Sequence, residues 1–252
     1  MNRISIVQAI IRKLKAQSYV EIGVSLGHAF LSIDAPKKIA VDPKNLVRLH
    51  PITLKKDDWI LEFKKAYRFI LKLIGKEDSR FFEMTSDDFF KMQAHLLEER
   101  KVDVAFVDGL HTYGQALRDA ENCLKYLNQG GVIVLHDCNP ISSPIATPAE
   151  SFQEAVARNA PDWNKLWCGD VWKAIVYLRS FYKDLHVFVL DCDMGIGIMT
   201  KGSPENPLHY SSEQISTMTY SDLEANRDQL LNLKPVSCFD TFLSSLDRNP
   251  SH

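Results

Sequence analysis

The chain has no run of apolar residues long enough to cross a membrane, which would take about 20 residues in a helix. It has no Cys-x-x-Cys pair, and its 5 cysteines show no paired spacing, so we expect reduced thiols rather than disulfides. No signal peptide is recognisable, because basic residues near the start are interleaved with apolar ones at helical spacing. These absences predict a cytoplasmic protein that does not bind a membrane.

Positive charge is not in excess either. The sequence has 30 Lys and Arg against 32 Asp and Glu, which gives a formal net charge of -2. A nucleic-acid-binding surface needs clustered basic residues, whereas the short lysine pairs of this chain are explained by solvated helix faces. We therefore expect no nucleic-acid partner, and RNA is disfavoured as a substrate.

At 252 residues with 45% hydrophobic content, the chain can fold as one α/β domain with additions. Short apolar runs alternate with helical stretches, which is the pattern of a doubly wound, mostly parallel sheet covered on both faces. We expect strands near residues 18–22, 39–42, 80–84, 102–107, 131–136, 185–190 and 195–200, and helices near 2–16, 26–33, 58–74, 87–99, 113–127, 149–159 and 171–181. Only four residues join the last two strands, too few for a parallel crossover, so these strands should form an antiparallel hairpin.

Two segments exceed a minimal fold of this type. Residues 50–77 are long enough for an extra covering helix or part of a lid, and residues 139–170 form a long proline-rich connection. Because the second segment follows a strand end where such sheets bind ligands, we expect it to face the substrate. We therefore place one domain at residues 1–203 and a polar tail at 204–252, with a short helix near 220–231.

Two common nucleotide-binding fingerprints are missing. The chain has no Gly-x-x-x-x-Gly-Lys-Ser/Thr, and Gly-x-Gly-x-x-Gly fails because Gly23 is followed by valine and serine. Residues 21–28 read instead Glu-Ile-Gly-Val-Ser-Leu-Gly-His, directly after a short apolar run. A strand that ends at Ile22 and turns sharply would leave Gly23 and Gly27 where side chains would block a ligand. Glu21, at the end of that strand, would meet a cationic group.

A second acidic residue, Asp42, ends the next expected strand. It lies about 20 residues past the glycines, where nucleotide-binding folds place the carboxylate that accepts hydrogen bonds from ribose hydroxyls. An acid, a glycine turn and a further acid one βα unit later predict a site for a nucleoside-bearing cofactor.

The densest set of ionisable side chains lies in the middle of the chain. A buried strand ends in Asp108-Gly-Leu-His111, a helix with one apolar face follows, and residues 128–131 are typical of a helix cap and turn. The next strand ends in His136-Asp137. Because the two strands should be neighbours, Asp108, His136 and Asp137 should meet at one edge of the sheet, beside the glycine turn. Partly buried carboxylates cost free energy unless they are paired or bind a metal.

Taken together, these motifs resemble known methyltransferases. Glu-x-Gly-x-x-x-Gly at residues 21–27 is similar to the first motif of class I S-adenosylmethionine (SAM)-dependent methyltransferases. Asp-Gly-x-His-Thr-Tyr at 108–113, followed by Gly-Gly-Val-Ile-Val-Leu-His-Asp at 130–137, resembles the metal-dependent small-molecule O-methyltransferases. The likeness is greatest to the methyltransferase 24 (macrocin O-methyltransferase-like) and cephalosporin-hydroxylase-like group, and it covers roughly residues 18–200.

The resemblance implies a Rossmann-like, seven-stranded sheet with an antiparallel last strand, and SAM as the cofactor. In the family, the glycine turn passes the methionine part of SAM, the acid after the second strand holds the ribose, and a residue pair after the third strand meets the adenine. The positions carried over for cofactor binding are Glu21, Gly23, Ser25, Gly27, His28, Asp42, Ser86, Asp87 and Asp108. Ser86 and Asp87 also suit a helix start, and the two roles are compatible.

The resemblance also implies a metal site. The family holds Mg²⁺ with an acid after the fourth strand and two adjacent residues after the fifth, which correspond to Asp108, His136 and Asp137. His136 departs from the family pattern, since imidazole suits Mg²⁺ poorly and Mn²⁺, Fe²⁺ or Zn²⁺ better. Three interpretations stay open: the metal differs, His136 acts as a base instead, or the site has no metal.

The reaction implied is methyl transfer to a small-molecule acceptor placed in line with the methyl group of the sulfonium. A protonated hydroxyl is a poor nucleophile, so a divalent ion or a histidine must help to remove its proton. His111, close behind Asp108, is the first candidate base and His136 the second. The alternative for His111 is a residue at a helix start that is hydrogen-bonded to the backbone.

Two other functions stay open. One is a nicotinamide-dependent oxidoreductase on a similar fold, although the third glycine of the dinucleotide fingerprint is missing. The other is a protein that keeps the cofactor site without catalysis, because a fold alone does not prove activity. Residues 169–174 also resemble a family segment, but the sequence assigns them no role. The acceptor and its reacting atom, oxygen or nitrogen, are equally open, and a homodimer is the default oligomer.

Overall fold

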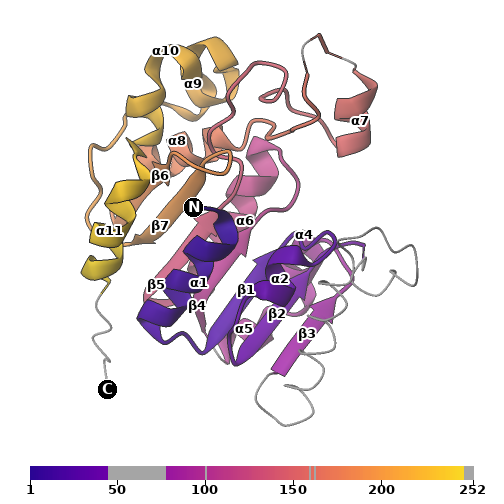
Figure 1. The fold of residues 1–252 in the computed structure, drawn as a ribbon, viewed down its shortest axis with the longest axis vertical. Coiled ribbons are helices and arrows are strands. Elements are labelled where there is room, and N and C mark those ends of the chain that lie inside the picture. The colour runs from indigo at the N-terminus through magenta and orange to yellow at the C-terminus, as the bar shows by residue number, and fades with distance from the viewer. Residues whose placement is uncertain (45–77, 100, 159, 162, 247–252) are drawn as a thin grey trace.

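In the part of the chain that the structure describes, one sheet has eight strands in the order β3-β2-β1-β4-β5-β7-β6-β8 (Figure 1). The computed structural model describes residues 1–44, 78–99, 101–158, 160–161 and 163–246. Its strands are β1 (Ser18–Ile22), β2 (Lys37–Val41), β3 (Asp78–Phe82), β4 (Val102–Val107), β5 (Leu127–Leu135), β6 (Leu185–Leu190), β7 (Ile196–Lys201) and β8 (Leu233–Lys234). Strands β1 to β6 point the same way, β7 runs against β5 and β6, and β8 is parallel to β6.

This topology confirms the predicted fold class and the antiparallel hairpin of β6 and β7. The eighth strand does not follow from the sequence, because a strand of 2 residues carries no alternation that a pattern could show. The order of the strands reverses at β1 and β4, and sheets of this kind bind ligands outside the carboxyl ends of the strands at such a point. The topology therefore predicts a ligand site at the loops after β1 and β4.

Helices cover both faces of the sheet. They are α1 (Arg3–Leu14), α2 (His28–Ser32), α4 (Ser86–Met92), α5 (His95–Glu98), α6 (Tyr113–Tyr126), α7 (Phe152–Ala157), α8 (Trp172–Phe181), α9 (Ser212–Thr217), α10 (Tyr220–Leu231), the 3-10 helix η1 (Val236–Cys238) and α11 (Phe239–Ser245). Helices α1, α2 and α11 share one core with Val104 and Phe106 of β4. Helices α4, α5, α6 and α8 share the other core with Ala105 and Val107. Successive residues of β4 thus fill opposite cores, which explains its continuous apolar sequence.

Helix α1 starts near the carboxyl ends of β4 and β5. Asn2 and Ser5 form a capping box, in which the Asn2 side chain accepts from the Ser5 N–H at 3.0 Å and Ser5 Oγ accepts from the Asn2 N–H at 3.1 Å. The apolar face recognised in the sequence is buried against the sheet through Ile6, Val7, Ile10, Ile11 and Leu14. The cap and this face together fix Arg3, the first residue of the helix, at that edge of the sheet.

The start of β5 corrects one prediction. Residues 128–131 are not a helix cap and turn, because α6 stops at Tyr126 and the extended backbone of Leu127 already begins β5. The pairing of β4 with β5 shifts register between Val102 and Val104, where residues 128–131 of β5 lie opposite Asp103 alone, and Gly130 in this irregular stretch has a φ of 73°. The two glycines therefore shape a strand rather than a turn.

Other predicted elements differ in detail. The helix expected near 87–99 is two short helices, α4 and α5, and the helix expected near 149–159 is α7, none of whose residues is buried. The helix expected near 58–74, and with it the insert at 50–77, lies outside the described residues. Among the described helices, none combines the length and the apolar character that a membrane crossing requires.

The C-terminal segment folds back onto the sheet. The helix expected near 220–231 is α10, and α9, β8, η1 and α11 accompany it. Arg179 of α8 is buried and donates to the carbonyl oxygens of Leu230 at 2.8 Å and Asn206 at 2.6 Å. This arginine therefore satisfies the Leu230 carbonyl near the end of α10, which the helix itself leaves unpaired, and ties it to the segment before α9.

Candidate active site

The carboxyl ends of β1, β4 and β5 lie side by side, as the sequence predicts. The N–H of Asp108 donates to the Ile22 carbonyl at 2.8 Å, and the N–H of His136 donates to the Val107 carbonyl at 3.0 Å. These bonds extend the sheet by one residue beyond each strand. They bring Asp108, His136 and Asp137 to the same edge as the glycine turn.

Gly23 is required by the backbone of the loop after β4. Its φ is +82°, and a Cβ atom built on it would lie 2.1 Å from the Asp108 carbonyl oxygen. The obstacle to a side chain is therefore protein backbone, and not only a ligand as the sequence suggested. Gly27, also at φ +82°, is the N-cap of α2, and Ser25 between them has a φ of +49°.

Asp42 holds the glycine turn in place. Its Oδ2 atom accepts hydrogen bonds from the N–H groups of Val24 at 2.8 Å and Ser25 at 2.9 Å. Its Oδ1 atom accepts from the Lys44 N–H at 2.8 Å. Oδ2 already accepts two hydrogen bonds, whereas Oδ1 accepts one and keeps a lone pair for a ribose hydroxyl. His28 is exposed at the start of α2, beside the turn.

Glu21 lies beneath the turn rather than at its surface. The side chain is 1% exposed and accepts a hydrogen bond from the Tyr19 hydroxyl. Burial raises the pKa of Glu21 to about 8, against the opposing effects of Tyr19 and Lys38. The cationic group near Glu21 is thus Lys38, whose Nζ atom donates to the Phe30 and Ile33 carbonyls. A contact of Glu21 with a cofactor stays a prediction.

Ser86 and Asp87 open α4, although the cap itself is Thr85, which accepts from the Asp88 N–H at 3.1 Å. Gln115 of α6 faces both residues, and its Nε2 atom donates to Ser86 Oγ at 3.1 Å and to Asp87 Oδ1 at 3.2 Å. The same atom donates to Asp119 Oδ1 at 3.0 Å. Asp119 is 1% exposed, and the sequence offered a signal for it: an acid on the apolar face of a helix.

Asp119 gives a prediction on pH and stability. Burial raises its pKa to about 6, so the folded protein binds this proton more tightly than the unfolded chain does. Its contribution to stability is therefore complete below about pH 4 and falls as the pH rises through about 6. We expect Asp119→Asn to abolish this pH dependence. Between pH 4 and 7, the free energy of unfolding of the variant should rise by about 2–3 kcal/mol relative to that of wild type. Urea unfolding across this range measures the difference in the free energy of unfolding, with the exposed Asp228→Asn as control. A constant difference between Asp119→Asn and wild type would refute the assignment.

His111 is bonded at both ring nitrogens. Its Nδ1 atom lies 2.7 Å from the Trp167 carbonyl oxygen, to which it donates. Its Nε2 atom lies 3.4 Å from Asp108 Oδ1 and 3.2 Å from Asp137 Oδ2. Burial lowers the pKa of His111, but Asp137 and Asp108 outweigh that effect and raise it overall. The two interpretations of His111 are thus compatible, since it follows a strand, bonds to backbone and still faces the carboxylates.

His136 lies on the other side of the same carboxylates. Its Nδ1 atom is 3.2 Å from Asp108 Oδ1 and 3.0 Å from Asp137 Oδ2. Its Nε2 atom is 3.2 Å from Arg3 Nη1 and 3.7 Å from Asp193 Oδ1. Burial lowers the pKa of His136, but the neighbouring carboxylates outweigh it and raise the pKa to about 12. The carboxylates thus favour the protonated form of His136, whose positive charge would offset theirs.

Four residues of this cluster do not appear among the predicted site residues. They are Arg3, Trp167, Cys168 and Asp193. Arg3 bonds to Asp193 through its N–H at 2.7 Å and its guanidinium at 3.2 Å, and its Nε atom is 3.9 Å from Asp108. The Cys168 thiol donates to Asp137 Oδ1 at 3.2 Å. Asp193 follows β6 at the same sheet edge, so the rule that located Asp108 could have located it.

The carboxylates and His111 fit a divalent cation. Oxygen and nitrogen atoms of Asp108, His111 and Asp137 all lie within 4.8 Å of one another. Ligand atoms about 2.1 Å from an ion, at angles of about 90–110°, are about 3.0–3.4 Å apart, which agrees with the His111 spacings. A small cavity of about 10 Å³, close to the size of one small ion or water, lies beside Asp108, His111 and His136, although Asp137 does not line it.

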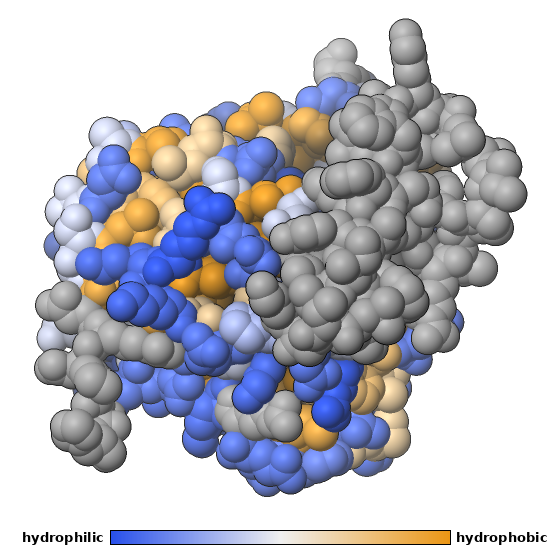
Figure 2. Space-filling model, turned by 60° about the horizontal axis from the view of Figure 1, so that its bottom comes forward, coloured by the Kyte–Doolittle hydropathy of each residue, from blue (hydrophilic) through white to orange (hydrophobic). Residues whose placement is uncertain are grey.

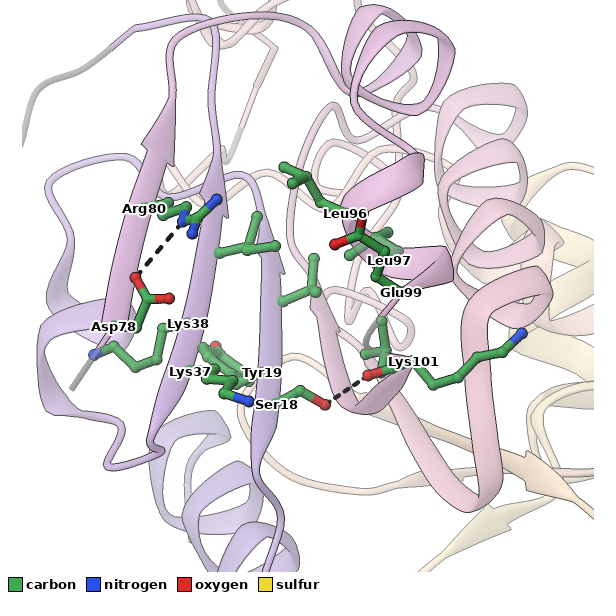
Figure 3. Close-up of a pocket in the computed structure, with 13 residues that line it drawn as sticks. Ser18, Tyr19, Lys37, Lys38, Asp78, Arg80, Leu96, Leu97, Glu99 and Lys101 are labelled. Atoms are coloured by element: carbon green, nitrogen blue, oxygen red, sulfur yellow. Dashed lines mark hydrogen bonds and ion pairs between the residues drawn. The ribbon is translucent and has the colours of Figure 1, made fainter. Parts of the chain in front are cut away.

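A larger cavity of about 80 Å³ lies at the opposite edge of the sheet, where β1, β2, β3 and β4 begin (Figure 3). Five aliphatic and six charged residues line it, and two of the charged ones, Asp78 and Arg80, pair with each other at 3.6 Å. Figure 2 turns this end of the protein forward and shows hydrophilic residues around smaller apolar areas. At that volume the cavity holds a few water molecules rather than a nucleoside, and it lies away from the carboxyl ends of the strands.

Comparison with known proteins identifies the domain. Residues 20–138 match the model of the methyltransferase 24 family, described as a methyltransferase domain. No curated protein matches the sequence. The methyltransferase of Podospora anserina bound to S-adenosylhomocysteine (SAH) has a TM-score of 0.50 and 17% identity, over 80% of this chain and 78% of that one. A candidate O-methyltransferase from Klebsiella pneumoniae has a TM-score of 0.50 and 11% identity, over 80% of each chain.

At such low identities the two structures show a common fold and nothing more. The family match is independent of them, and it spans the glycine turn, Asp42, Asp108 and the His136-Asp137 pair. It confirms the resemblance that these motifs predicted. Residues 20–138 of the chain thus match a methyltransferase domain, that of the methyltransferase 24 family.

Proposed function

We propose that the protein uses SAM to methylate a hydroxyl oxygen of a small molecule. The observation that carries the proposal is the position of Asp108, His111 and Asp137 directly beside the glycine turn. The methyltransferase domain spans both features. A methyltransferase of similar fold was solved with SAH, the demethylated form of the cofactor, which supports the same ligand for this chain.

The cofactor would lie across the ends of β1, β2 and β3. Asp42 would accept hydrogen bonds from the ribose hydroxyls while it continues to hold the turn. Ser86 and Asp87 would meet the adenine, with Gln115 behind them. The methionine part would then pass the turn at residues 23–27 and bring the methyl group toward Asp108.

The carboxylates and imidazoles would prepare the acceptor. A divalent cation held by Asp108, His111 and Asp137 would lower the pKa of an acceptor hydroxyl and orient it. Because His111 donates through Nδ1 to a carbonyl, its Nε2 atom is the one with a lone pair for that role. Without a cation, the same Nε2 atom would take the proton of the hydroxyl.

We assign His111, rather than the predicted His136, as the nitrogen ligand. The remaining ring nitrogen of His136, Nε2, lies 3.2 Å from the Arg3 guanidinium, a cation. The remaining ring nitrogen of His111, Nδ1, donates instead to the neutral Trp167 carbonyl, while its Nε2 faces the two carboxylates. The positive charge of His136 would repel a metal ion but stabilises the carboxylates when they carry excess negative charge. His136 is therefore proposed to balance charge, not to coordinate.

Cofactor binding tests the proposed function and distinguishes it from a nicotinamide-dependent oxidoreductase. We expect calorimetry to show SAH binding to the wild-type protein and no binding of NAD. Asp42→Ala should weaken SAH binding by about 10- to 100-fold, because it removes charge-assisted hydrogen bonds to the ribose and the support of the turn. The exposed Asp228→Ala should bind as wild type does. Binding of NAD instead of SAH, or full SAH affinity in Asp42→Ala, would contradict the proposal.

A further inference from the structure

Residues 167–170 pack against the back of His111. A Cβ atom built on Gly169 would lie only 1.8 Å from the His111 carbonyl oxygen and 3.2 Å from the His111 Cβ, and the φ of Gly169 is +58°. Glycine is therefore needed here for space and for conformation. This gives a structural meaning to a segment that the sequence left without a role.

The same segment fixes the imidazole of His111. The Trp167 carbonyl accepts the Nδ1 proton at 2.7 Å, and the Trp167 ring lies against the His111 ring, with centroids 4.8 Å apart and planes at 33°. The Trp167 Nε1 atom in turn donates to the Thr147 carbonyl at 2.9 Å. The orientation of Nε2 toward Asp108 and Asp137 thus depends on where residue 167 is held.

Asp170 fixes the backbone that follows His111. Thr112 is the N-cap of α6 but its side chain makes no capping bond, and Asp170 Oδ1 accepts from the Tyr113 N–H instead, at 2.7 Å. Asp170 Oδ2 lies 3.5 Å from Lys173 Nζ, which also donates to the Ser216 carbonyl at 3.0 Å. A residue from a distant part of the sequence therefore caps α6 and is itself anchored to α8 and α9.

The segment is also attached to the 139–166 loop. The N–H groups of Cys168 and Gly169 both donate to the Ile145 carbonyl at 3.0 Å. A displacement of the loop near Ile145 would therefore be transmitted through residues 167–170 to the His111 ring.

We propose that Trp167, Gly169 and Asp170 are positioning residues, which hold the His111 ring toward the two carboxylates and couple it to the 139–166 loop. The proposal deepens the function proposed above, because the loop is where the acceptor would bind. These residues touch neither cofactor nor acceptor in this role. They act through the tautomer and direction of His111, which sets whether Nε2 presents its lone pair to the site.

Nuclear magnetic resonance of the histidine side chains tests the proposal directly. The protein has 8 histidines, and His111→Gln identifies the signals of His111. In wild type we expect a slowly exchanging Nδ1 proton on His111. Asp170→Ala and Gly169→Ala should lose it or shift it, whereas Asp170→Asn, which keeps an oxygen acceptor for the Tyr113 N–H, should retain it.

Thr85→Ala is the matched control, because it also deletes a helix N-cap, that of α4, which has no bond to residues 167–170 among those described. Unchanged His111 signals in Asp170→Ala, or equal changes in Thr85→Ala, would overturn the proposal. If Gly169→Ala fails to fold, the pair Asp170→Ala and Asp170→Asn still decides it.

Two titrations separate this proposal from the proposed function. Asp170→Ala should bind Mn²⁺ about 10- to 100-fold more weakly than wild type, as expected for a group that orients a ligand, with unchanged SAH affinity. Full Mn²⁺ affinity in Asp170→Ala would count against the proposal. Failure of wild type to bind SAH would refute the methyltransferase proposal, while the His111 signals would still decide the positioning role.

Discussion

Asp137→Asn should slow methyl transfer by about 10²- to 10⁴-fold, the range for losing a group that assists proton removal from the acceptor. Asp137 Oδ2 lies 3.2 Å from His111 Nε2 and 3.0 Å from His136 Nδ1, so one carboxylate serves both imidazoles. The amide keeps the size of the side chain but removes its charge, so cofactor affinity should change little. SAH release from SAM, with an acceptor found by screening hydroxylated small molecules, measures the rate.

The matched control is Asp228→Asn, which changes an exposed carboxylate of α10. It should keep turnover within about twofold of wild type, as surface substitutions away from a site do. A comparison of the histidines refines the result, since His111→Gln should reduce Mn²⁺ affinity more than His136→Gln does. If Asp137→Asn turned over as fast as wild type, the proposed mechanism would be refuted.

Gly23→Ala should destabilise the protein by about 2–4 kcal/mol, because it adds a clash to an unfavourable backbone conformation. The new Cβ atom would lie 2.1 Å from the Asp108 carbonyl oxygen and 2.5 Å from Gly109 Cα, both backbone atoms that cannot turn aside as a side chain can. For a protein of this size, the melting temperature should fall by roughly 5–15 °C. SAH binding should weaken as well, since the turn and Asp108 must separate.

Gly114→Ala is the control for this substitution. Gly114 lies in the first turn of α6, and the nearest atom to an added Cβ is Arg118 Nη1 at 3.6 Å, an ordinary contact. Alanine favours the helix over glycine by about 1 kcal/mol, so Gly114→Ala should leave the melting temperature unchanged or raise it slightly. Equal melting temperatures for Gly23→Ala and wild type would show that the turn does not pack against Asp108 as described.

The edge of the sheet could be predicted because it depends on local signals. Apolar runs locate the parallel strands, and each strand delivers the residue at its carboxyl end to the same edge. That rule placed Asp108 beside His136 and Asp137, and the structure brings the three together. The glycine turn and Asp42 follow from the same rule one strand further on.

The roles of the two histidines could not be predicted, because they depend on partners distant in the sequence. His111 is oriented by the Trp167 carbonyl, 56 residues away. Every residue has a backbone carbonyl, so residue type does not reveal which one accepts this bond. His136 is engaged by Arg3, 133 residues away, which reaches the site because α1 packs along the sheet. Neither contact has a periodicity or motif that would reveal it.

Crystals grown with SAH and Mn²⁺, measured at a wavelength where manganese scatters anomalously, test the central claim most directly. We predict an anomalous peak bonded to Asp108, His111 and Asp137, with the sulfur of SAH directed toward it from the turn at residues 23–27. SAH bound elsewhere, or placed in the turn with its sulfur directed away from the Asp108, His111 and Asp137 side chains, would contradict the account.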